Sequence, residues 1–323
     1  MMADDYVSRP FGRALADLGE RYDNLIVVDA DLQRGTETDL FMSRFPTRYF
    51  NVGVAEANMV GISAGLALSG KTVFCGTFAC FTSQRACDQV AVVAYCEANV
   101  KLFGIEAGLY SGGNGATHQG MLDLAIMRAM PNMTVYVPCD ATETRAIMEY
   151  LMEHPGPAYM RAPRKKAPLI LDPADYRFQA SKAVRLSEGS DVTLIACGIM
   201  VPRALQAADE LTAEGISCRV INMSSIKPLD EQEILRAASE TGCIVTAENH
   251  NILGGLGSAV AEVVTSHCPV PVLRVGIRDA FGEVGTLDWL ADRFRIGPAH
   301  IAQAARKALD LKEMRPSAAS SMK

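Results

Sequence analysis

Short runs of apolar, mostly β-branched residues alternate along this chain with longer segments in which apolar residues recur at helical spacing. In the first half, strands are predicted at 25–31, 48–53, 71–78, 100–107 and 133–138. Helices are predicted near 9–21, 56–68, 80–97, 119–129 and 140–153. Because the strands are nearly continuous in apolar residues, the pattern predicts a mostly parallel sheet that is covered by helices on both faces.

A second block of the same kind follows a stretch rich in proline and basic residues at 154–176, a composition typical of linkers. Its predicted strands, each followed by a helical segment, are 191–198, 218–223, 243–249 and 271–277. The fold class is therefore α/β, with two three-layer α/β/α domains. The predicted bounds are a first domain at 1–160, a linker at 161–180, a second domain at 181–313 and a disordered tail at 314–323. The basic run at 164–166 is interpreted as a solvated face of the linker.

Composition and charge limit the class of protein, its partners and its cellular compartment. The 323 residues are 49% apolar and 21% charged, which is ordinary for a globular protein with two cores. A net charge of −6 argues against nucleic acid or an anionic membrane as the main partner. The nine cysteines are scattered without a Cys-x-x-Cys pair, which favours reduced thiols in the cytoplasm. The polar N-terminus and the lack of a membrane-spanning apolar run also predict a cytoplasmic protein.

One carboxylate stands out in the apolar, glycine-spaced stretch from 51 to 70. It is Glu56, and the nearest charged residues are Arg48 and Lys71. Glu56 begins a predicted helix after a strand, at the edge of a parallel sheet where ligands bind. A buried acid that holds or shares a proton can hydrogen-bond a heterocyclic nitrogen and move a proton onto it. From this stretch alone, the alternative is a glutamate that stabilises the helix N-terminus through the helix dipole.

Three further motifs each have an ordinary structural explanation. Phe78 and Phe81 open a predicted helix, and phenylalanines at this spacing usually belong to the core. A glycine-rich loop ends in His118 and Gln119, and a histidine after glycines usually hydrogen-bonds its own loop. The GGLG turn at 254–257 suits close packing of a helix against a strand.

Taken in order, these motifs resemble the C-terminal half of transketolase over nearly the whole chain. The segments that carry the resemblance are VGVAEANMVGISAGLA, TFACF, GATHQ, LAIMRAMPN and ENHNILGGLGSA. The resemblance implies that Glu56 hydrogen-bonds N1′ of the aminopyrimidine ring of thiamine diphosphate, and that Phe78 and Phe81 pack around that ring. It also implies a transferase that moves a two-carbon ketol unit from a ketose to an aldehyde acceptor. The C-terminal domain of this family lies apart from the cofactor, so 181–313 is expected to brace the assembly.

The cofactor site that this resemblance implies is incomplete on this chain. Thiamine enzymes hold the diphosphate through Mg²⁺, with a Gly-Asp-Gly motif followed some tens of residues later by asparagine. The sequence contains no Gly-Asp-Gly. We therefore expect no metal ligand on this chain, and a partner, an N-terminal transketolase subunit, that supplies the diphosphate and Mg²⁺ site. The family arrangement implies an α₂β₂ heterotetramer with thiamine diphosphate between the chains.

Two arginines look like those of the phosphosugar site of the family. Arg9 and Arg161 can each offer forked donors to an anion, and the alternative is ordinary surface charge. His118 keeps its family identity and is expected to contact the substrate hydroxyls or the dihydroxyethyl intermediate. Gln119 is expected to support the loop that carries His118.

Other sugar contacts depart from the family pattern. Glu106 stands where the family has a histidine that contacts phosphate and sugar, and Asn114 replaces an aspartate that reads an acceptor hydroxyl. Gly35 appears where a phosphate-binding serine is usual. A glutamate repels a nearby phosphate unless it is protonated or paired with arginine. These changes predict a specialised transketolase that uses a non-phosphorylated or otherwise unusual sugar in at least one substrate role.

Three alternatives stay open at this point. The β subunit of a 2-oxo-acid dehydrogenase shares the two-domain plan and the GGLG turn. A deoxyxylulose-phosphate synthase-like enzyme is a second relative, although TFACF and GATHQ fit transketolase better. A non-catalytic regulatory or scaffolding pyrimidine-domain protein is the third, and the joint presence of Glu56, Phe78, Phe81 and His118 argues against it.

Overall fold

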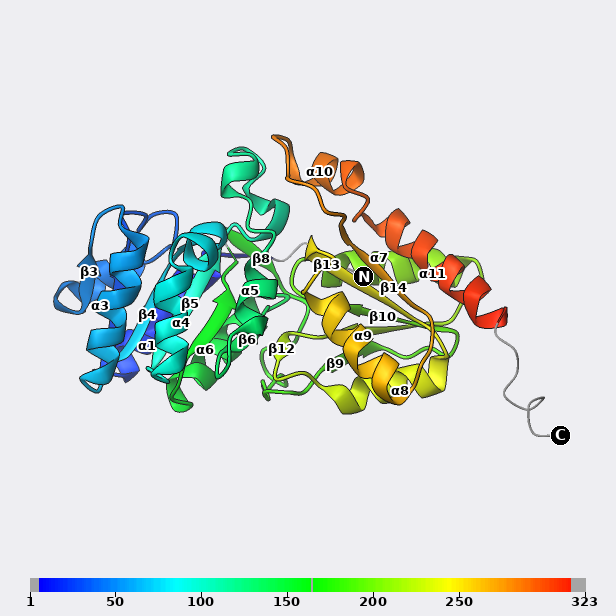
Figure 1. Cartoon of the computed structure of the whole chain (residues 1–323), viewed down its shortest axis with the longest axis horizontal. Coiled ribbons are helices and arrows are strands. Elements are labelled where there is room, and N and C mark those ends of the chain that lie inside the picture. The colour runs from blue at the N-terminus through cyan, green and yellow to red at the C-terminus, as the bar shows by residue number, and fades with distance from the viewer. Residues whose placement is uncertain (1–5, 164, 315–323) are drawn as a thin grey trace.

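A computed structural model describes residues 6–163 and 165–314 and shows two α/β domains side by side (Figure 1). The sheet of the first domain has seven strands in the order β12-β6-β7-β5-β4-β2-β3. The sheet of the second domain has five strands in the order β14-β13-β10-β11-β9. Most neighbouring strands are parallel, and the predicted fold class of two α/β domains is confirmed.

All the strands predicted for the first domain are present in its sheet. They are β2 (Leu25–Asp29), β3 (Tyr49–Asn51), β4 (Thr72–Phe78), β5 (Val100–Ile105) and β6 (Thr134–Tyr136), with β7 (Ala158–Arg161) in addition. The helices are α1 (Pro10–Arg21), α2 (Asp39–Arg44), α3 (Glu56–Leu68), α4 (Cys87–Tyr95), α5 (Asp123–Ala129) and α6 (Ala141–Glu153). Alternate strand residues face opposite cores: Val73 packs in the core that contains α3 and α4, and Phe74 in the one that contains α1 and α6.

Two predicted helices begin later than their apolar spacing indicates. The segment predicted as one helix at 80–97 starts as a π-helical turn, Phe81–Arg85, and only then becomes α4. The side chains of Thr82 and Ser83 donate to the carbonyl oxygens of Phe103 (3.1 Å) and Ala79 (2.6 Å), which favours an irregular turn here. The helix predicted from 119 begins at Asp123, because the glycine-rich loop before it forms separate 3₁₀ turns.

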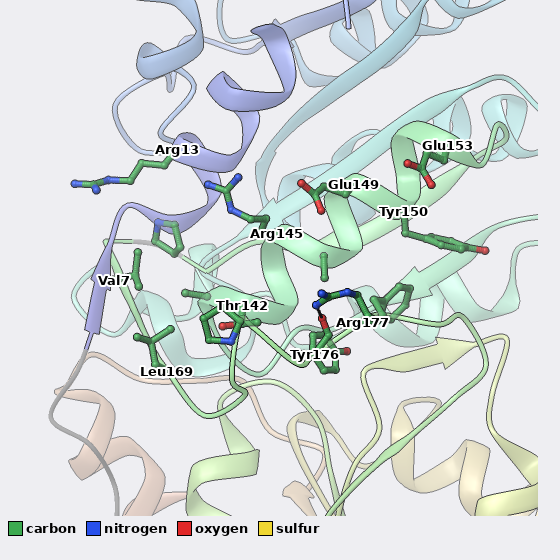
Figure 2. A pocket seen from close by; sticks show the side chains of 15 residues that line it. Val7, Arg13, Thr142, Arg145, Glu149, Tyr150, Glu153, Leu169, Tyr176 and Arg177 are labelled. Carbon is green, nitrogen blue, oxygen red and sulfur yellow. Dashed lines mark hydrogen bonds between the residues drawn. The ribbon is translucent and has the colours of Figure 1, made fainter. Parts of the chain in front are cut away.

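The predicted linker is partly folded. Its strand β8 (Lys166–Pro168) pairs antiparallel with β1 (Tyr6–Ser8). The residues that follow, 169–178, run beside α1 and α6 and border a groove of about 630 Å³ (Figure 2). Arg164 of the predicted basic face lies outside the described residues. So does the predicted tail, apart from Met314, which follows the last helix.

The second domain repeats the alternation of strands and helices. Its strands are β9 (Val184–Ser187), β10 (Val192–Ala196), β11 (Cys218–Asn222), β13 (Ile244–Asn251) and β14 (Val272–Ile277). Its helices are α7 (Met200–Ala213), α8 (Glu231–Thr241), α9 (Leu256–His267), α10 (Leu287–Arg293) and α11 (Pro298–Glu313). One short strand, β12 (Ser225–Lys227), leaves this domain and pairs antiparallel with β6 of the first sheet. The two domains therefore share a sheet edge, which the sequence pattern did not predict.

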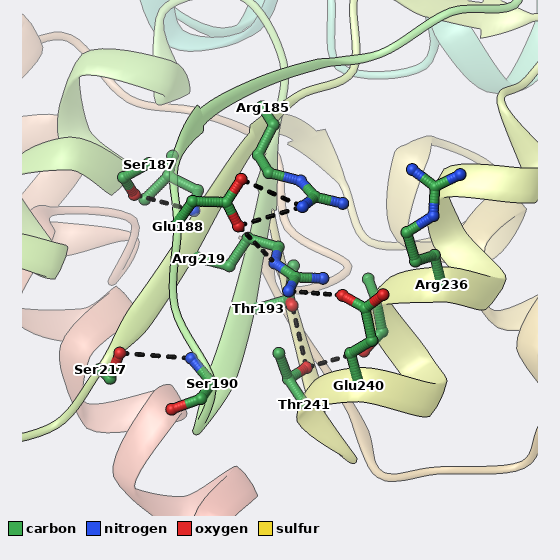
Figure 3. A network of polar contacts seen from close by, with 12 residues as sticks. Arg185, Ser187, Glu188, Ser190, Thr193, Ser217, Arg219, Arg236, Glu240 and Thr241 are labelled. Atoms are coloured by element: carbon green, nitrogen blue, oxygen red, sulfur yellow. Dashed lines mark hydrogen bonds and ion pairs between the residues drawn. The ribbon is translucent and has the colours of Figure 1, made fainter.

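Ion pairs cover the antiparallel edge of the second sheet (Figure 3). Arg185 of β9 pairs with Glu188 at 3.0 Å, and Arg219 of β11 pairs with Glu240 of α8 at 2.6 Å. Charged side chains along an edge strand oppose the addition of a further strand. All nine cysteines are free thiols, as predicted. Within the described ranges, no helix combines the length and apolar character needed to cross a membrane.

Candidate active site

Glu56 is the first residue of α3 and lies just beyond the carboxyl end of β3. Its side chain is only 7% exposed, so the predicted burial of this acid is confirmed. The positive end of the helix dipole favours a carboxylate at this position. Cys80 lies close by, and burial, with smaller contributions from the carboxylates of Asp123 and Glu56, raises the pKa of its thiol to about 12. Cys80 is therefore a neutral thiol near pH 7 and not a nucleophile.

Two neighbouring phenylalanine rings and the ring of the distant His118 meet beside the first turn after β4. Phe78 ends β4, Phe81 begins the π-helical turn, and their ring centroids are 5.6 Å apart. The His118 ring lies 5.0 Å from Phe78 and 5.2 Å from Phe81, and its contacts with both are edge-to-face. Thr117 Oγ1 and His118 Nδ1 share a hydrogen bond of 2.9 Å. The result is an apolar wall with one imidazole at its rim.

The loop that carries His118, residues 106–120, is held by both domains and is called the substrate loop below. Gln119 is buried and donates to the carbonyl oxygen of Glu283 at 3.0 Å, in line with its predicted supporting role. The backbone N–H of Gly285 donates to the carbonyl oxygen of Gly112 at 3.0 Å. Asn114 is exposed on this loop and donates to Ser111 Oγ at 3.0 Å.

Arg9 lies near the start of the first domain, in the turn just before α1. Its φ of 53° is left-handed, and its guanidinium pairs with Asp39 of α2. Gly35 sits in the neighbouring turn, where a Cβ would lie 3.0 Å from Leu32 Cγ, so a larger residue would have to displace Leu32. In the part of the chain that the structure describes, no hydrogen bond, ion pair or ring contact joins Arg9 to the rings of Phe78, Phe81 and His118.

Arg161 is buried at the end of β7 and does not present an open fork to an anion, so that expectation needs correction. Its Nε and Nη2 atoms donate to the two carboxylate oxygens of Asp123 at 2.8 and 2.6 Å, and Nη1 donates to the carbonyl oxygen of Asn249 at 3.0 Å. Burial alone would raise the pKa of Asp123, but the Arg161 guanidinium holds it below its usual value. Tyr159 completes this buried group by donating to Asp123 at 2.6 Å. The fork therefore joins structural elements within the chain.

Glu106 borders the same region. Its side chain is 7% exposed, its backbone φ is +55°, and it lines a small cavity of about 50 Å³ together with Tyr110, Arg161 and Asn249. Sequence reasoning missed Asp123 and Asn249. A signal was present, because the apolar strand β13 ends in four consecutive polar residues that all prove to be buried: Glu248, Asn249, His250 and Asn251.

Glu248, the first of these polar residues, explains the GGLG turn. Glu248 accepts from the backbone N–H groups of Leu256 (2.7 Å) and Gly257 (2.9 Å) at the start of α9. A Cβ on Gly255 would lie 2.0 Å from Glu248 Oε2, so this approach requires glycine. Burial raises the pKa of Glu248 to about 7 and lowers that of His250 to about 4. The GGLG turn is therefore a structural element, as interpreted from the sequence.

A cavity of about 470 Å³ lies between the domains. Its lining, which includes Cys80, Thr117, Gln119 and Phe281, contains sequence neighbours of the ring cluster but none of its three rings. The larger groove of Figure 2 is lined by none of the predicted site residues. Among the residues that the structure describes, no three His, Cys, Asp or Glu side chains gather closely enough to hold a metal ion.

Comparison with known proteins identifies the family. The model of the transketolase pyrimidine-binding domain matches residues 7–169, and that of the transketolase C-terminal domain matches residues 181–301. The 6-deoxy-6-sulfo-D-fructose transketolase subunit of Clostridium sp. (strain MSTE9) is 45% identical over 93% of this chain and 94% of its own length. An apulose-4-phosphate transketolase subunit of Phocaeicola vulgatus is 40% identical over 86% of this chain and 90% of its own.

Solved structures agree with this result. A split gene transketolase, described as an inactive beta4 tetramer, is 43% identical, has a TM-score of 0.86 and covers 94% of this chain and 97% of its own. A transketolase from Campylobacter jejuni is 21% identical with a TM-score of 0.79 over 94% of this chain and 47% of its own, and it shows the shared fold alone. The chain therefore belongs to the transketolase family and carries the pyrimidine-binding and C-terminal domains of that family.

Proposed function

We propose that this chain is the C-terminal subunit of a two-component transketolase, which moves a two-carbon ketol unit from a ketose to an aldehyde acceptor. The observation that carries the proposal is the buried Glu56 at the start of α3, together with the ring cluster of Phe78, Phe81 and His118. Relatives that are named as transketolase subunits match this chain over nearly their whole length, which supports a separate N-terminal partner subunit.

The family depends on thiamine diphosphate, and the residues present fit its aminopyrimidine ring. Glu56 is a shielded acid at a helix start, and Phe78 and Phe81 form an apolar wall. Glu56 would hold the ring nitrogen by a hydrogen bond and keep or pass a proton at that atom, while the phenylalanines exclude water. When bound, thiamine diphosphate supplies the electron sink that cleavage of a carbon–carbon bond requires. His118 shares its Nδ1 with Thr117, which leaves Nε2 to bind a substrate hydroxyl.

The rest of the cofactor site is assigned to the partner. Because this sequence contains no Gly-Asp-Gly motif, we assign the diphosphate and Mg²⁺ ligands to the N-terminal subunit, with two copies of each chain in an α₂β₂ assembly. The 43% identical relative described as an inactive beta4 tetramer supports the need for a partner. The cytoplasmic location stays a prediction from the sequence.

Glu106 supports a specialised substrate. By the resemblance, this position holds a histidine that contacts phosphate and sugar, so a buried glutamate changes the polar group that the site offers to a sugar. The names of the relatives specify 6-deoxy-6-sulfo-D-fructose and apulose-4-phosphate, which are unusual sugars. We propose that at least one substrate of this enzyme is likewise a non-phosphorylated or otherwise unusual sugar, contacted by His118 and Asn114 and, at its other end, by Arg9 and Glu106.

The test is reconstitution with the N-terminal subunit from the same organism. We expect each chain alone to be inactive, and the pair to transfer a ketol unit between a donor and an acceptor from a panel of ketoses and aldehydes in the presence of thiamine diphosphate and Mg²⁺. Ketol transfer by this chain alone would contradict the two-component form. Decarboxylation of pyruvate without ketol transfer would favour a 2-oxo-acid dehydrogenase or a deoxyxylulose-phosphate synthase-like enzyme. Cofactor binding without any turnover would favour a regulatory or scaffolding protein.

A further inference from the structure

We propose that Asn249, a residue of the C-terminal domain, is a positioning residue for the substrate loop of the first domain. It holds the turn 106–109 by hydrogen bonds on both sides of Gly108 and thereby helps to place Glu106, which contributes to sugar selection. The inference rests on the proposed function, and it gives the second domain a part in specificity in addition to its role as a brace.

Asn249 joins three segments at the boundary between the domains. It is 3% exposed on β13, and its Oδ1 accepts from the backbone N–H of Leu109 at 3.0 Å. Its Nδ2 donates to the carbonyl oxygen of Ala107 at 3.1 Å. Its own carbonyl oxygen accepts from Arg161 Nη1 at 3.0 Å, so the strand is anchored to β7 at the same point. One side chain therefore pairs with backbone groups on both sides of Gly108.

The turn that Asn249 holds has an unfavourable backbone conformation. Glu106 has a φ of +55° and Gly108 a φ of +61°. A residue with a Cβ rarely adopts this left-handed conformation, and it persists only where the surroundings hold it. A Cβ on Gly108 would lie 2.2 Å from the carbonyl oxygen of Asn249, which shows how closely the two segments pack. Without the Asn249 amide, the buried Leu109 N–H would lose its partner and the Ala107 carbonyl oxygen would keep only the 3.4 Å bond from Tyr110 N–H, so the turn would rearrange.

The expected consequence is on substrate binding more than on chemistry. Glu106 precedes the two residues that Asn249 holds, and its side chain lines the same small cavity as Asn249 and Tyr110. The other end of the substrate loop meets the turn through the bond from Gly108 N–H to the carbonyl oxygen of Gly120 (2.6 Å), but it has anchors of its own in the Gln119 bond to Glu283 and the ring contacts of His118. Loss of the Asn249 amide should therefore move Glu106 more than His118.

The experiment compares Asn249→Ala with Asn222→Ala in the assembled two-subunit enzyme. Asn222 is a matched control, because it is also a buried asparagine on a strand of the second domain. Its Nδ2 also donates across the domain boundary, to Glu143 of α6 at 2.9 and 3.0 Å, but it does not touch the substrate loop. Hydrogen exchange at the Leu109 amide is one readout. The other readouts are kcat and KM. They are measured with the best ketose probe among D-fructose, D-fructose 6-phosphate and 6-deoxy-6-sulfo-D-fructose.

We expect Asn249→Ala to speed exchange at Leu109 and to raise the KM on the order of tenfold, the change expected for the loss of a buried hydrogen-bonded contact, with kcat within about twofold. Asn222→Ala should change neither Leu109 exchange nor KM. In a Glu106→Ala background, Asn249→Ala should add little, because coupled residues are not additive.

Three results would overturn the inference: unchanged exchange at Leu109, equal KM effects in the two asparagine variants, or a full additional effect in the Glu106→Ala background. If the assembled pair transfers no ketol unit, the proposed function fails on that observation. The exchange measurement needs no turnover and still decides whether Asn249 holds the turn.

Discussion

Replacing Asp123 with asparagine tests how strongly the buried Arg161 ion pair joins the elements around the site. Asp123 is fully buried, and its two carboxylate oxygens accept three hydrogen bonds, from Tyr159 and from Nε and Nη2 of Arg161. Asparagine keeps the size of the side chain but replaces one acceptor oxygen with an NH₂ group that faces a donor. The guanidinium of Arg161 would then be a buried cation without its counter-charge.

The expected loss follows from that geometry. Removing one partner of a buried, hydrogen-bonded ion pair costs about 3–5 kcal/mol, because the remaining charge stays desolvated. This is a large fraction of the roughly 5–15 kcal/mol by which a domain is usually stable. The pKa of Asp123 is lower in the folded chain than in the unfolded chain, so its stabilisation is present above the unfolded value of about 3.9 and is lost as the pH falls through the folded value. The difference between wild type and Asp123→Asn should therefore shrink in acid.

The assay is urea denaturation at pH 7 and at lower pH, with Asp17→Asn as the control. Asp17 also contacts two arginines, Arg44 and Arg145, but its side chain is 39% exposed, so its pairs should contribute only about 0–1 kcal/mol. Equal losses in the two variants at pH 7 would refute the reasoning, since they would show that burial of the Asp123 pair has no special effect.

Three further predictions follow from the same structure. Glu56→Gln should lower the kcat of the assembled enzyme on the order of 10²–10⁴-fold with little change in the urea midpoint, and a fully active variant would remove the assignment of Glu56 as the residue that binds the cofactor ring. Burial raises the pKa of Glu248 to about 7, so its contribution to stability is fully present below the unfolded pKa of about 4.3 and is lost as the pH rises through about 7. Glu248→Gln should therefore flatten the dependence of the unfolding free energy on pH over that window. An unchanged dependence would contradict the raised pKa. Gly108→Ala should destabilise the chain by more than about 1 kcal/mol in urea denaturation, because its φ is +61° and a Cβ would collide with Asn249, whereas the exposed Gly113, with no atom near its Cβ position, should tolerate alanine.

The sequence predicted the features that depend on local pattern. The apolar strands of both sheets are where their composition indicated, and Glu56 is buried at a helix start because an isolated acid in an apolar, glycine-spaced stretch has few other environments. The meeting of Phe78 and Phe81 also follows from spacing, because both flank the end of β4. These features need only short-range information.

The features that were missed depend on long-range partners. The fork of Arg161 is closed by Asp123, 38 residues away, and its third bond goes to Asn249, 88 residues away. Whether an arginine faces solvent or a buried carboxylate cannot be read from its own neighbours in the sequence. The strand β12 has only three residues and pairs with a sheet of the other domain, so no periodicity marks it.

The same long-range bonds bear on how an enzyme of this kind can be divided between two chains. The substrate loop is positioned by Asn249, Glu283 and Gly285, all from the C-terminal domain, through bonds of 3.0 to 3.1 Å. Such bonds require the two domains to keep a fixed relative position, which the shared strand β12 and the bond from Arg161 Nη1 to the carbonyl oxygen of Asn249 provide within one polypeptide. On the proposed function, a diphosphate site on another chain would have to meet only the carboxyl edge of the first sheet, where Glu56 begins α3. The division into two chains therefore leaves the substrate loop and all three residues that position it on this chain.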